Sequence, residues 1–280
     1  LLAVFPFIAR LILALIKRRQ FLNQYPPPPA VDRNVVVIGG GSAGLVASLI
    51  AAATRAKVTL IEMDRMGGDC LNTGCVPSKA LIKVAKQTHQ ARHAERLGIN
   101  GLTPEIDFKA VMAHVHKAIE TIEPHDSMAR YRQLGVECIK GRAQILSPYE
   151  VEVNGQRLST RSIVLATGAH PRVPALPGLE AVDYYTSDTI WDLAELPQRL
   201  LVLGGGPIGC ELAQAFARLG SEVTVLDRGE RLLKREDSDV SSLLEEHFTA
   251  EGIRVLLATE ALGFEVIDGV AHVQHVPVGA

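Results

Sequence analysis

The chain has 280 residues, of which 47% are apolar and 21% charged, and its formal net charge at pH 7 is −2. This length is enough for two domains with sizeable cores, and the near-neutral charge gives no electrostatic footprint for nucleic acid. Four cysteines in a chain of this length do not make a disulfide framework. A pair among them is instead expected to be reactive, in a reducing compartment such as the cytoplasm.

The first thirty residues differ in composition from the rest. Residues 1–16 are apolar apart from Arg10, and the basic cluster Lys17–Arg19 follows them. A secretory signal peptide has the reverse order, and a spanning helix needs about 20 apolar residues. Two interpretations stay open: the end of a transmembrane span whose basic cluster marks the cytoplasmic side, or an amphipathic helix packed on protein or on a membrane surface. The prolines at 26–29 predict a stiff, extended spacer.

A complete dinucleotide-binding pattern follows. The β-branched run Val35–Ile38 predicts a buried strand, and three glycines then open a helix that runs through Ala53. A second strand, residues 57–61, ends at Glu62. The first glycine permits a tight turn, the second lets the backbone approach a pyrophosphate, and the third lets the helix pack closely on the sheet. The helix N-terminus would stabilise the phosphate charge, and the acid would bind the adenosine ribose. The residues of the turn are Gly39, Gly41, Ser42, Ala43 and Gly44.

The same order recurs about 165 residues later, which predicts a second dinucleotide site. Electron transfer between two bound dinucleotides is the simplest reason for the repeat, and a duplicated fold with one dead site is the alternative. The acid Asp227 suits a free ribose 2′-hydroxyl and therefore favours NADH, whereas Arg228 and Arg231 keep NADPH possible. The predicted elements are strand Leu200–Leu203, the glycines Gly204, Gly206 and Gly209, helix Glu211–Leu219 and strand Glu222–Leu226.

Two cysteines, Cys70 and Cys75, lie between the repeats, and Lys79 follows four residues later. Residues five apart in a regular helix are about 8–9 Å apart at Cα, too far for a disulfide, so a Cys70–Cys75 pair requires Cys70 to lie in irregular chain before the helix. Cys75 would then begin a helix with Lys79 one turn on, and both features favour a thiolate. A zinc site and two buried structural thiols are the alternatives. Cys138 and Cys210 are expected to be core residues.

The segment Gly67–Lys79 resembles the redox motif of the flavin-dependent pyridine nucleotide–disulfide oxidoreductases, a family that includes dihydrolipoamide dehydrogenase, glutathione reductase and mercuric reductase. The resemblance covers residues 34 to 280 and leans toward the mercuric-reductase-like branch. The segment Ala166–Gly168 is similar to the family's Ala-Thr-Gly stretch, where the chain meets the flavin nucleotide. A hairpin that turns at Asn154–Gly155 matches the antiparallel layer expected in that domain.

The resemblance implies roles for single residues. Cys75 would be the flavin-proximal thiol, and Cys70 the interchange thiol that attacks or coordinates the acceptor. Lys79 would lie near the flavin N5 and pair with Glu211, where the two charges could stabilise charge that develops during hydride transfer. Some relatives have an aromatic gate where this chain has Pro207. FAD would contact the first glycine turn and Glu62, together with Gly68, Ala166, Thr167 and Gly168. NAD(P)H would contact the second turn and Asp227 and Arg228.

The resemblance thus predicts an α/β chain of two Rossmann-like, doubly wound domains, the first with an antiparallel β insertion. The expected division is a tether at 1–30, an FAD domain at 31–190 and an NAD(P)H domain at 191–280. The expected activity passes electrons from NADH through FAD to the Cys70–Cys75 disulfide, and on to a disulfide or a metal ion. The alternatives are a membrane-tethered flavin module that does not turn over by itself and an NADH:quinone-type dehydrogenase with idle cysteines.

The resemblance also implies parts that lie downstream of this sequence. These are the rest of the NAD domain, a flavin-contacting Gly-Asp segment and a dimer domain that supplies a His–Glu acid–base pair, so the full-length protein is expected to be a homodimer. The chain's own histidines on the predicted helices are given no catalytic role, and no resident metal is expected. These histidines are His89, His93, His114 and His116.

Overall fold

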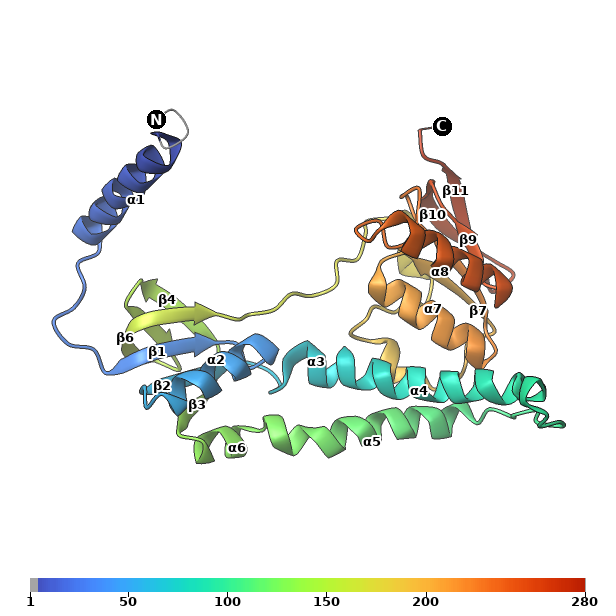
Figure 1. Ribbon diagram of the computed structural model, residues 1–280, viewed down its shortest axis with the longest axis horizontal. Coiled ribbons are helices and arrows are strands. Elements are labelled where there is room, and N and C mark those ends of the chain that lie inside the picture. The colour runs from blue at the N-terminus through green and yellow to red at the C-terminus, as the bar shows by residue number, and fades with distance from the viewer. Residues whose placement is uncertain (1–4, 280) are drawn as a thin grey trace. The chain divides into compact units, whose positions relative to one another are not determined.

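The computed structural model describes residues 5–279, in two compact units (Figure 1). The first unit holds the chain up to Gly68 together with Glu123–Gly168, and the second holds Asp69–Ile122 together with the chain from Ala169 onward. Residues 1–4 of the expected N-terminal tether and Ala280 of the expected NAD(P)H domain lie outside the described residues.

The first unit is built on one mixed sheet, in the order β3-β2-β1-β6-β5-β4. Strands β3, β2, β1 and the C-terminal part of β6 run parallel, whereas β4, β5 and the start of β6 are antiparallel. The predicted hairpin turn is confirmed, since Asn154 and Gly155 have φ of 52° and 77°. The helices are α1 (Phe5–Gln24), α2 (Ser42–Ala53) and α6 (Met128–Gln133); the strands are β1 (Arg33–Ile38), β2 (Val58–Glu62), β3 (Val136–Lys140), β4 (Ala143–Ser147), β5 (Glu150–Val153) and β6 (Gln156–Leu165).

The core of the first unit follows from the predicted apolar strands. Every residue of β2 is buried, and α2 packs Leu45 against Val37 and Leu60. A charged network closes the start of the sheet, because the guanidinium of Arg33 donates to Thr59 Oγ1 at 2.6 Å and to the Glu137 carboxylate at 3.0 Å. The network links β1, β2 and β3 and so fixes the strand that leads into the first glycine turn.

The second unit holds a parallel sheet in the order β7-β8-β9 and an antiparallel pair, β10 and β11. The predicted repeat of strand, glycine turn, helix and strand is confirmed in β7, α7 and β8. The helices are α3 (Gly68–Asn72), α4 (Cys75–Arg92), α5 (Phe108–Asp126), α7 (Pro207–Leu219) and α8 (Ser238–Ala250); the strands are β7 (Arg199–Leu203), β8 (Glu222–Leu226), β9 (Arg254–Leu256), β10 (Thr259–Ile267) and β11 (Val270–Pro277).

Helices α4 and α5 pack against α7. Because of this packing, the boundaries of the two compact units differ from the boundary expected at residue 190. Leu81 of α4 and Val115 of α5 are fully buried in the same cluster as Phe216 of α7, and the rings of Phe108 and Phe216 lie 6.2 Å apart. Burial of one such side chain stabilises a fold by about 1.5–3 kcal/mol. The apolar faces of α4 and α5 therefore pack in the core of the second compact unit, and the division into FAD and NAD(P)H domains at residue 190 stays a prediction.

Among the described helices, none has both the length and the apolar content needed to cross a bilayer.

Candidate functional site

The first glycine turn, between β1 and α2, requires glycine at two places. Gly39 has φ of +107°, and a Cβ there would collide with the carbonyl oxygen of Ala166. A Cβ on Gly44 would collide with the carbonyl oxygen of Gly39, so α2 can approach the strand only because this side chain is absent. The predicted roles of Gly39 and Gly44 in the turn and in helix packing therefore have a direct steric basis.

Glu62 braces this turn from the end of β2. Its Oε2 accepts a hydrogen bond from the Gly40 amide at 2.5 Å, and its Oε1 accepts one from the Asp64 amide at 2.6 Å. The carboxylate is buried, and each oxygen keeps a second lone pair. The contacts of Glu62 in the structure thus fix the backbone of the loop. Its binding of a ribose stays a prediction.

The loop fits a dinucleotide pyrophosphate. A Cβ on Gly41 would meet only Gly68 Cα, at 3.6 Å, so the outer side of the loop is open to close approach by a ligand. The first amides of α2, at Ser42 and Ala43, precede the intrahelical hydrogen-bond ladder and lie at the positive end of the helix. The segment that starts at Ala166 is joined to β1, because its amide donates to the Ile38 carbonyl at 2.8 Å. The first turn, Gly68 and residues 166–168 are thereby brought together in one unit.

The second glycine turn repeats this geometry in the second unit. Gly204 has φ of +111°, and Asp227 accepts hydrogen bonds from the amides of Gly205 at 2.6 Å and Gly229 at 2.5 Å. A Cβ on Gly209 would collide with the Gly204 carbonyl oxygen. Among the described residues, no atom beyond the adjoining residues lies within 4 Å of a Cβ built on Gly206. The second turn therefore fits a pyrophosphate as the first does.

Both arginines that follow Asp227 have partners on the protein. Arg228 forms an ion pair with Glu260 at 3.4 Å, and Arg231 donates to the Lys234 carbonyl oxygen at 3.0 Å. A guanidinium held in this way is less free to bind a 2′-phosphate. This arrangement bears on the choice between NADH and NADPH.

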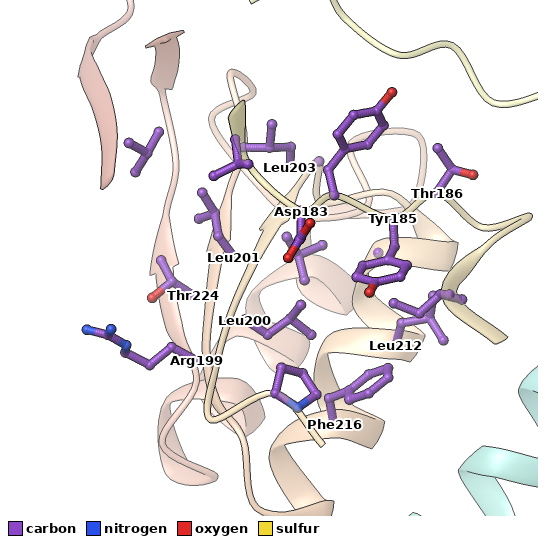
Figure 2. Close-up of a pocket in the computed structure, with 18 of the residues that line it drawn as sticks. Asp183, Tyr185, Thr186, Arg199, Leu200, Leu201, Leu203, Leu212, Phe216 and Thr224 are labelled. Carbon is purple, nitrogen blue, oxygen red and sulfur yellow. The ribbon is translucent and has the colours of Figure 1, made fainter. Parts of the chain in front are cut away.

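A large open cavity of about 1190 Å³ lies against β7 in the second unit (Figure 2). Leu200, Leu201 and Leu203 of the strand line it, with Phe216 of α7 and Tyr185 of the preceding segment (Figure 2). Within residues 5–279, β7 pairs with β8 on one side only. Apolar side chains of an edge strand therefore line the cavity.

The two cysteines lie on either side of a break between two helices. Cys70 lies in the short helix α3, and Cys75 is the first residue of α4. The amides of Thr73 and Gly74 both donate to the Asp69 carbonyl oxygen, at 2.9 and 2.5 Å, which folds the chain back between the thiols. Irregular chain was expected at Cys70; the structure instead has a separate helical turn there, and the break follows it. Both cysteines are free thiols in this structure.

The electrostatics of the thiol pair correct one expectation. A hydrogen bond with Cys70, followed by burial, raises the pKa of Cys75 above its ordinary value, whereas a backbone hydrogen bond and the Lys79 ammonium oppose this rise. The helix N-terminus and Lys79 were expected to favour the thiolate outright. The reason for the difference is that a thiol that shares its proton with a second sulfur is stabilised in its protonated form.

Lys79 and Glu211 form the predicted pair. The ammonium Nζ donates to both carboxylate oxygens of Glu211 at 2.7 Å, which joins α4 to the N-terminal half of α7. The side chains are 60% and 44% exposed, and pairs so exposed contribute about 0.2–1 kcal/mol to stability. The pair therefore contributes little to stability, and its role in hydride transfer stays a prediction.

Trp191 holds the loop between the cysteines and was missed by the sequence analysis. Its indole Nε1 donates to the carbonyl oxygens of Thr73 and Ser187, both at 2.8 Å, and the residue is buried. Thr73 lies between Cys70 and Cys75, so the indole fixes the backbone that sets their separation. No local signal links a tryptophan to a loop 118 residues earlier.

The remaining cysteines and histidines do not form a further site. Cys138 and Cys210 are buried as expected, and burial raises the pKa of both thiols, that of Cys210 to about 11. The rings of His89 and His93 pack together with centroids 4.2 Å apart. In the described part of the chain, no group of three or more His, Cys, Asp or Glu side chains is placed to hold a metal ion.

Comparison with known proteins agrees with this geometry. The family described as pyridine nucleotide-disulphide oxidoreductase matches residues 33–276. The chain is 36% identical over 214 residues to a mercuric reductase of Lysinibacillus sphaericus, covering 76% of this chain and 39% of that protein. It is also 36% identical over 230 residues to a dihydrolipoyl dehydrogenase of Chlamydia muridarum, covering 79% and 49%.

Among solved structures, the HOCl-induced flavoprotein disulfide reductase RclA from Escherichia coli superimposes with a TM-score of 0.73 at 27% identity, covering 86% of this chain and 52% of that one. The chain therefore spans about half or less of the length of these relatives. Enzymes of this family use FAD and NAD(P)H. The family match, the two glycine turns and the paired thiols agree, and the chain belongs to the pyridine nucleotide-disulphide oxidoreductase family.

Proposed function

We propose that the chain carries the coenzyme sites and the dithiol of an NADH-dependent flavoprotein that reduces a disulfide or a thiol-binding metal ion. The observation that carries this proposal is the placement of Cys70 and Cys75 across the α3–α4 break, hydrogen-bonded to each other and followed by the Lys79–Glu211 pair. Bound FAD would supply the two-electron relay between the nicotinamide and the thiols.

The dithiol has the parts needed for exchange with a disulfide acceptor. The Cys70 thiolate attacks one sulfur of the acceptor, and the other acceptor sulfur leaves as a thiolate. The Cys75 thiolate then attacks the Cys70 sulfur, which closes the Cys70–Cys75 disulfide and releases the second acceptor thiol. The protein loses two electrons and two protons in this sequence, and the acceptor gains them.

The contacts of Cys75 suit the second of these steps. The hydrogen bond with Cys70 is the largest cause that raises the pKa of Cys75, and it weakens once the Cys70 sulfur is bonded to the acceptor. The Lys79 ammonium and the backbone hydrogen bond then act without that opposition and favour the thiolate. Loss of the hydrogen bond with Cys70 therefore favours the Cys75 thiolate at the step in which it attacks.

The assignment of Cys70 as the interchange thiol rests on the family resemblance. In the structure Cys75 is exposed and Cys70 is half-buried, so exposure alone would make Cys75 the easier thiol for a small reagent to reach.

A metal ion is the second candidate acceptor, because the chain is similar to mercuric reductases. Two adjacent thiolates are soft ligands, and soft cations prefer such ligands. Two electrons from NADH, relayed by bound FAD, would reduce the bound divalent ion, and the two thiolates would release it without a net change in their own oxidation state.

The proposed coenzyme is NADH. Asp227 lies at the end of β8, where an acid suits a ribose 2′-hydroxyl, and the two nearby arginines have partners on the protein. We also propose a homodimer in a reducing compartment, as the family resemblance and the free cysteines suggest.

The exchange step can be tested by single turnover with a chromogenic aromatic disulfide. The reduced protein should release two equivalents of aromatic thiol and end with a Cys70–Cys75 disulfide, which peptide mass spectrometry would identify. Cys75→Ser should release one equivalent and stall as a mixed disulfide on Cys70. Cys138→Ala serves as the control and should behave as the unaltered protein. If Cys75→Ser still released two equivalents, the proposed exchange would be wrong.

A further inference from the structure

The N-terminal helix α1 presents an apolar stripe that the described structure does not cover. Its side chains follow the i, i+3, i+4, i+7, i+8 spacing of one helix face. They are between 47% and 62% exposed, and none belongs to a buried core cluster. The residues of the stripe are Ile8, Leu11, Ile12, Leu15 and Ile16.

The charge on this helix is of one sign. Residues 5–24 contain Arg10 and the basic cluster Lys17–Arg19, and they contain no Asp or Glu. The helix contributes +4 to a chain whose net charge is −2, which leaves −6 on the remainder. At 100° per residue, Arg10 and Lys17 lie on the face opposite the stripe, together with the exposed side chains of Leu13 and Phe21. The last two basic residues lie in the C-terminal part of the helix.

We propose that α1 docks on an anionic lipid surface, with the apolar stripe in the acyl boundary and the basic side chains at the headgroups. An exposed apolar stripe with a basic opposite face is the pattern of helices that lie in the membrane interface. Each Lys or Arg near such a surface is attracted by the anionic lipids, whereas the acidic remainder of the chain is repelled. The membrane contact is thus confined to this helix.

Charge also decides against a second copy of the chain as the occupant. A pair of α1 helices packed along their stripes would carry eight positive charges, four on each helix, with no acidic side chain on either helix to neutralise them. The spacer between α1 and β1, which includes residues 26–29, contains no helix or strand. It therefore supplies no apolar helix or strand that could cover the stripe.

The test is sedimentation of the protein with lipid vesicles at low ionic strength. Vesicles of phosphatidylcholine with 30% phosphatidylglycerol are compared with pure phosphatidylcholine. We expect binding to the anionic vesicles to be at least about tenfold tighter, and to weaken as salt is raised.

Two pairs of matched variants separate the stripe from the charge. Leu15→Asp puts a carboxylate in the stripe and should abolish binding, whereas Ala14→Asp puts the same charge on the opposite face and should weaken it only a few-fold. The double variant Lys17→Glu, Arg18→Glu should lose at least about tenfold in affinity for anionic vesicles. The charge-matched control Lys83→Glu, Lys86→Glu on α4 should bind as the unaltered protein does.

Three results would overturn the proposal. Equal binding to neutral and anionic vesicles would remove the role of the basic cluster, and equal effects of Leu15→Asp and Ala14→Asp would remove the role of the stripe. Absence of vesicle binding, together with a concentration-dependent oligomer that Leu15→Asp dissociates, would assign the stripe to a second copy of the chain instead.

Discussion

The first and second glycine turns have nearly the same backbone in different surroundings. Gly39 and Gly204 have φ of +107° and +111°, and in each unit an acid at the end of the next strand accepts two backbone amides. The first turn is packed against Ala166, which follows β6, the strand that pairs with β1. In the described part of the chain, no atom beyond the adjoining residues lies within 4 Å of a Cβ built on Gly204, and β7 has one strand partner. The dinucleotide turn is thus formed by its own strand, helix and acid, and it does not depend on the neighbouring strand.

The largest effect should come from adding one methyl group to each turn. Gly39→Ala combines backbone strain with a collision against the Ala166 carbonyl and should cost more than about 3 kcal/mol of unfolding free energy. Gly204→Ala adds backbone strain without a collision, and it should cost about 1–2 kcal/mol of unfolding free energy. Urea unfolding followed by circular dichroism measures both. Equal losses would mean that Gly204 is packed as tightly as Gly39, and the contrast between the units would fail.

A substitution on the open side of the first turn should separate binding from folding. Gly41→Val places its side chain where a pyrophosphate would approach, while its Cβ meets the protein only at ordinary contact distance. FAD affinity should fall by about a hundredfold or more, because the valine side chain blocks the close approach of the pyrophosphate to the protein backbone. Calorimetric titration measures the affinity, and an unchanged circular dichroism spectrum is the control. Full flavin binding by this variant would remove the first turn as the FAD site.

The acid of the second turn provides a smaller test in the second unit. Asp227→Ala removes the carboxylate that would repel a 2′-phosphate, so the preference for NADH over NADPH should narrow by about tenfold. The dissociation constants of the two coenzymes give the ratio directly. Arg231→Ala is the matched variant, and it should leave the ratio within about twofold because this side chain is held by the Lys234 carbonyl. A native preference for NADPH would contradict the interpretation of Asp227.

The smallest effect concerns a buried thiol that no step uses. Burial raises the pKa of Cys210 from its ordinary value of 9.0 to about 11, so the folded protein favours the protonated thiol. The resulting stabilisation is fully present below pH 9 and is lost as the pH rises through about 11. Thiolate absorbance near 240 nm should show Cys210 titrating about two units higher in the folded protein than in urea. The difference spectrum between the native protein and Cys210→Ala isolates this signal, and titration near pH 9 in the folded state would contradict the burial.

Local patterns in the sequence predicted both turns well. Gly39, Gly44, Gly204 and Gly209 were assigned their steric roles from spacing alone, because the turn and its helix are made by neighbouring residues. The β10–β11 hairpin was not predicted, although Asp268 and Gly269, with φ of 51° and 76°, form a recognisable turn pair.

Features that depend on distant residues could not be predicted. The apolar faces of α4 and α5 are visible in the sequence, but nothing local specifies α7 as the surface that buries them. The contact of Trp191 with Thr73 and the shared proton of the thiol pair arise in the same way, from chain brought together by folding. The Lys79–Glu211 contact was predicted only because the family resemblance supplied the pairing.

The central claim, that Cys70 and Cys75 form the redox pair of a nicotinamide-dependent flavoprotein, is tested most directly by counting thiols. The protein is loaded with FAD, oxidised mildly, and then given NADH under anaerobic conditions, and alkylated peptides are mapped by mass spectrometry. The account predicts that Cys70 and Cys75 resist alkylation after oxidation and that NADH restores both as alkylatable thiols, two per chain. Cys138 and Cys210 should stay unreactive toward the alkylating reagent throughout. If NADH left the Cys70–Cys75 disulfide intact while it reduced the flavin, the cysteines would be idle and the account would be contradicted.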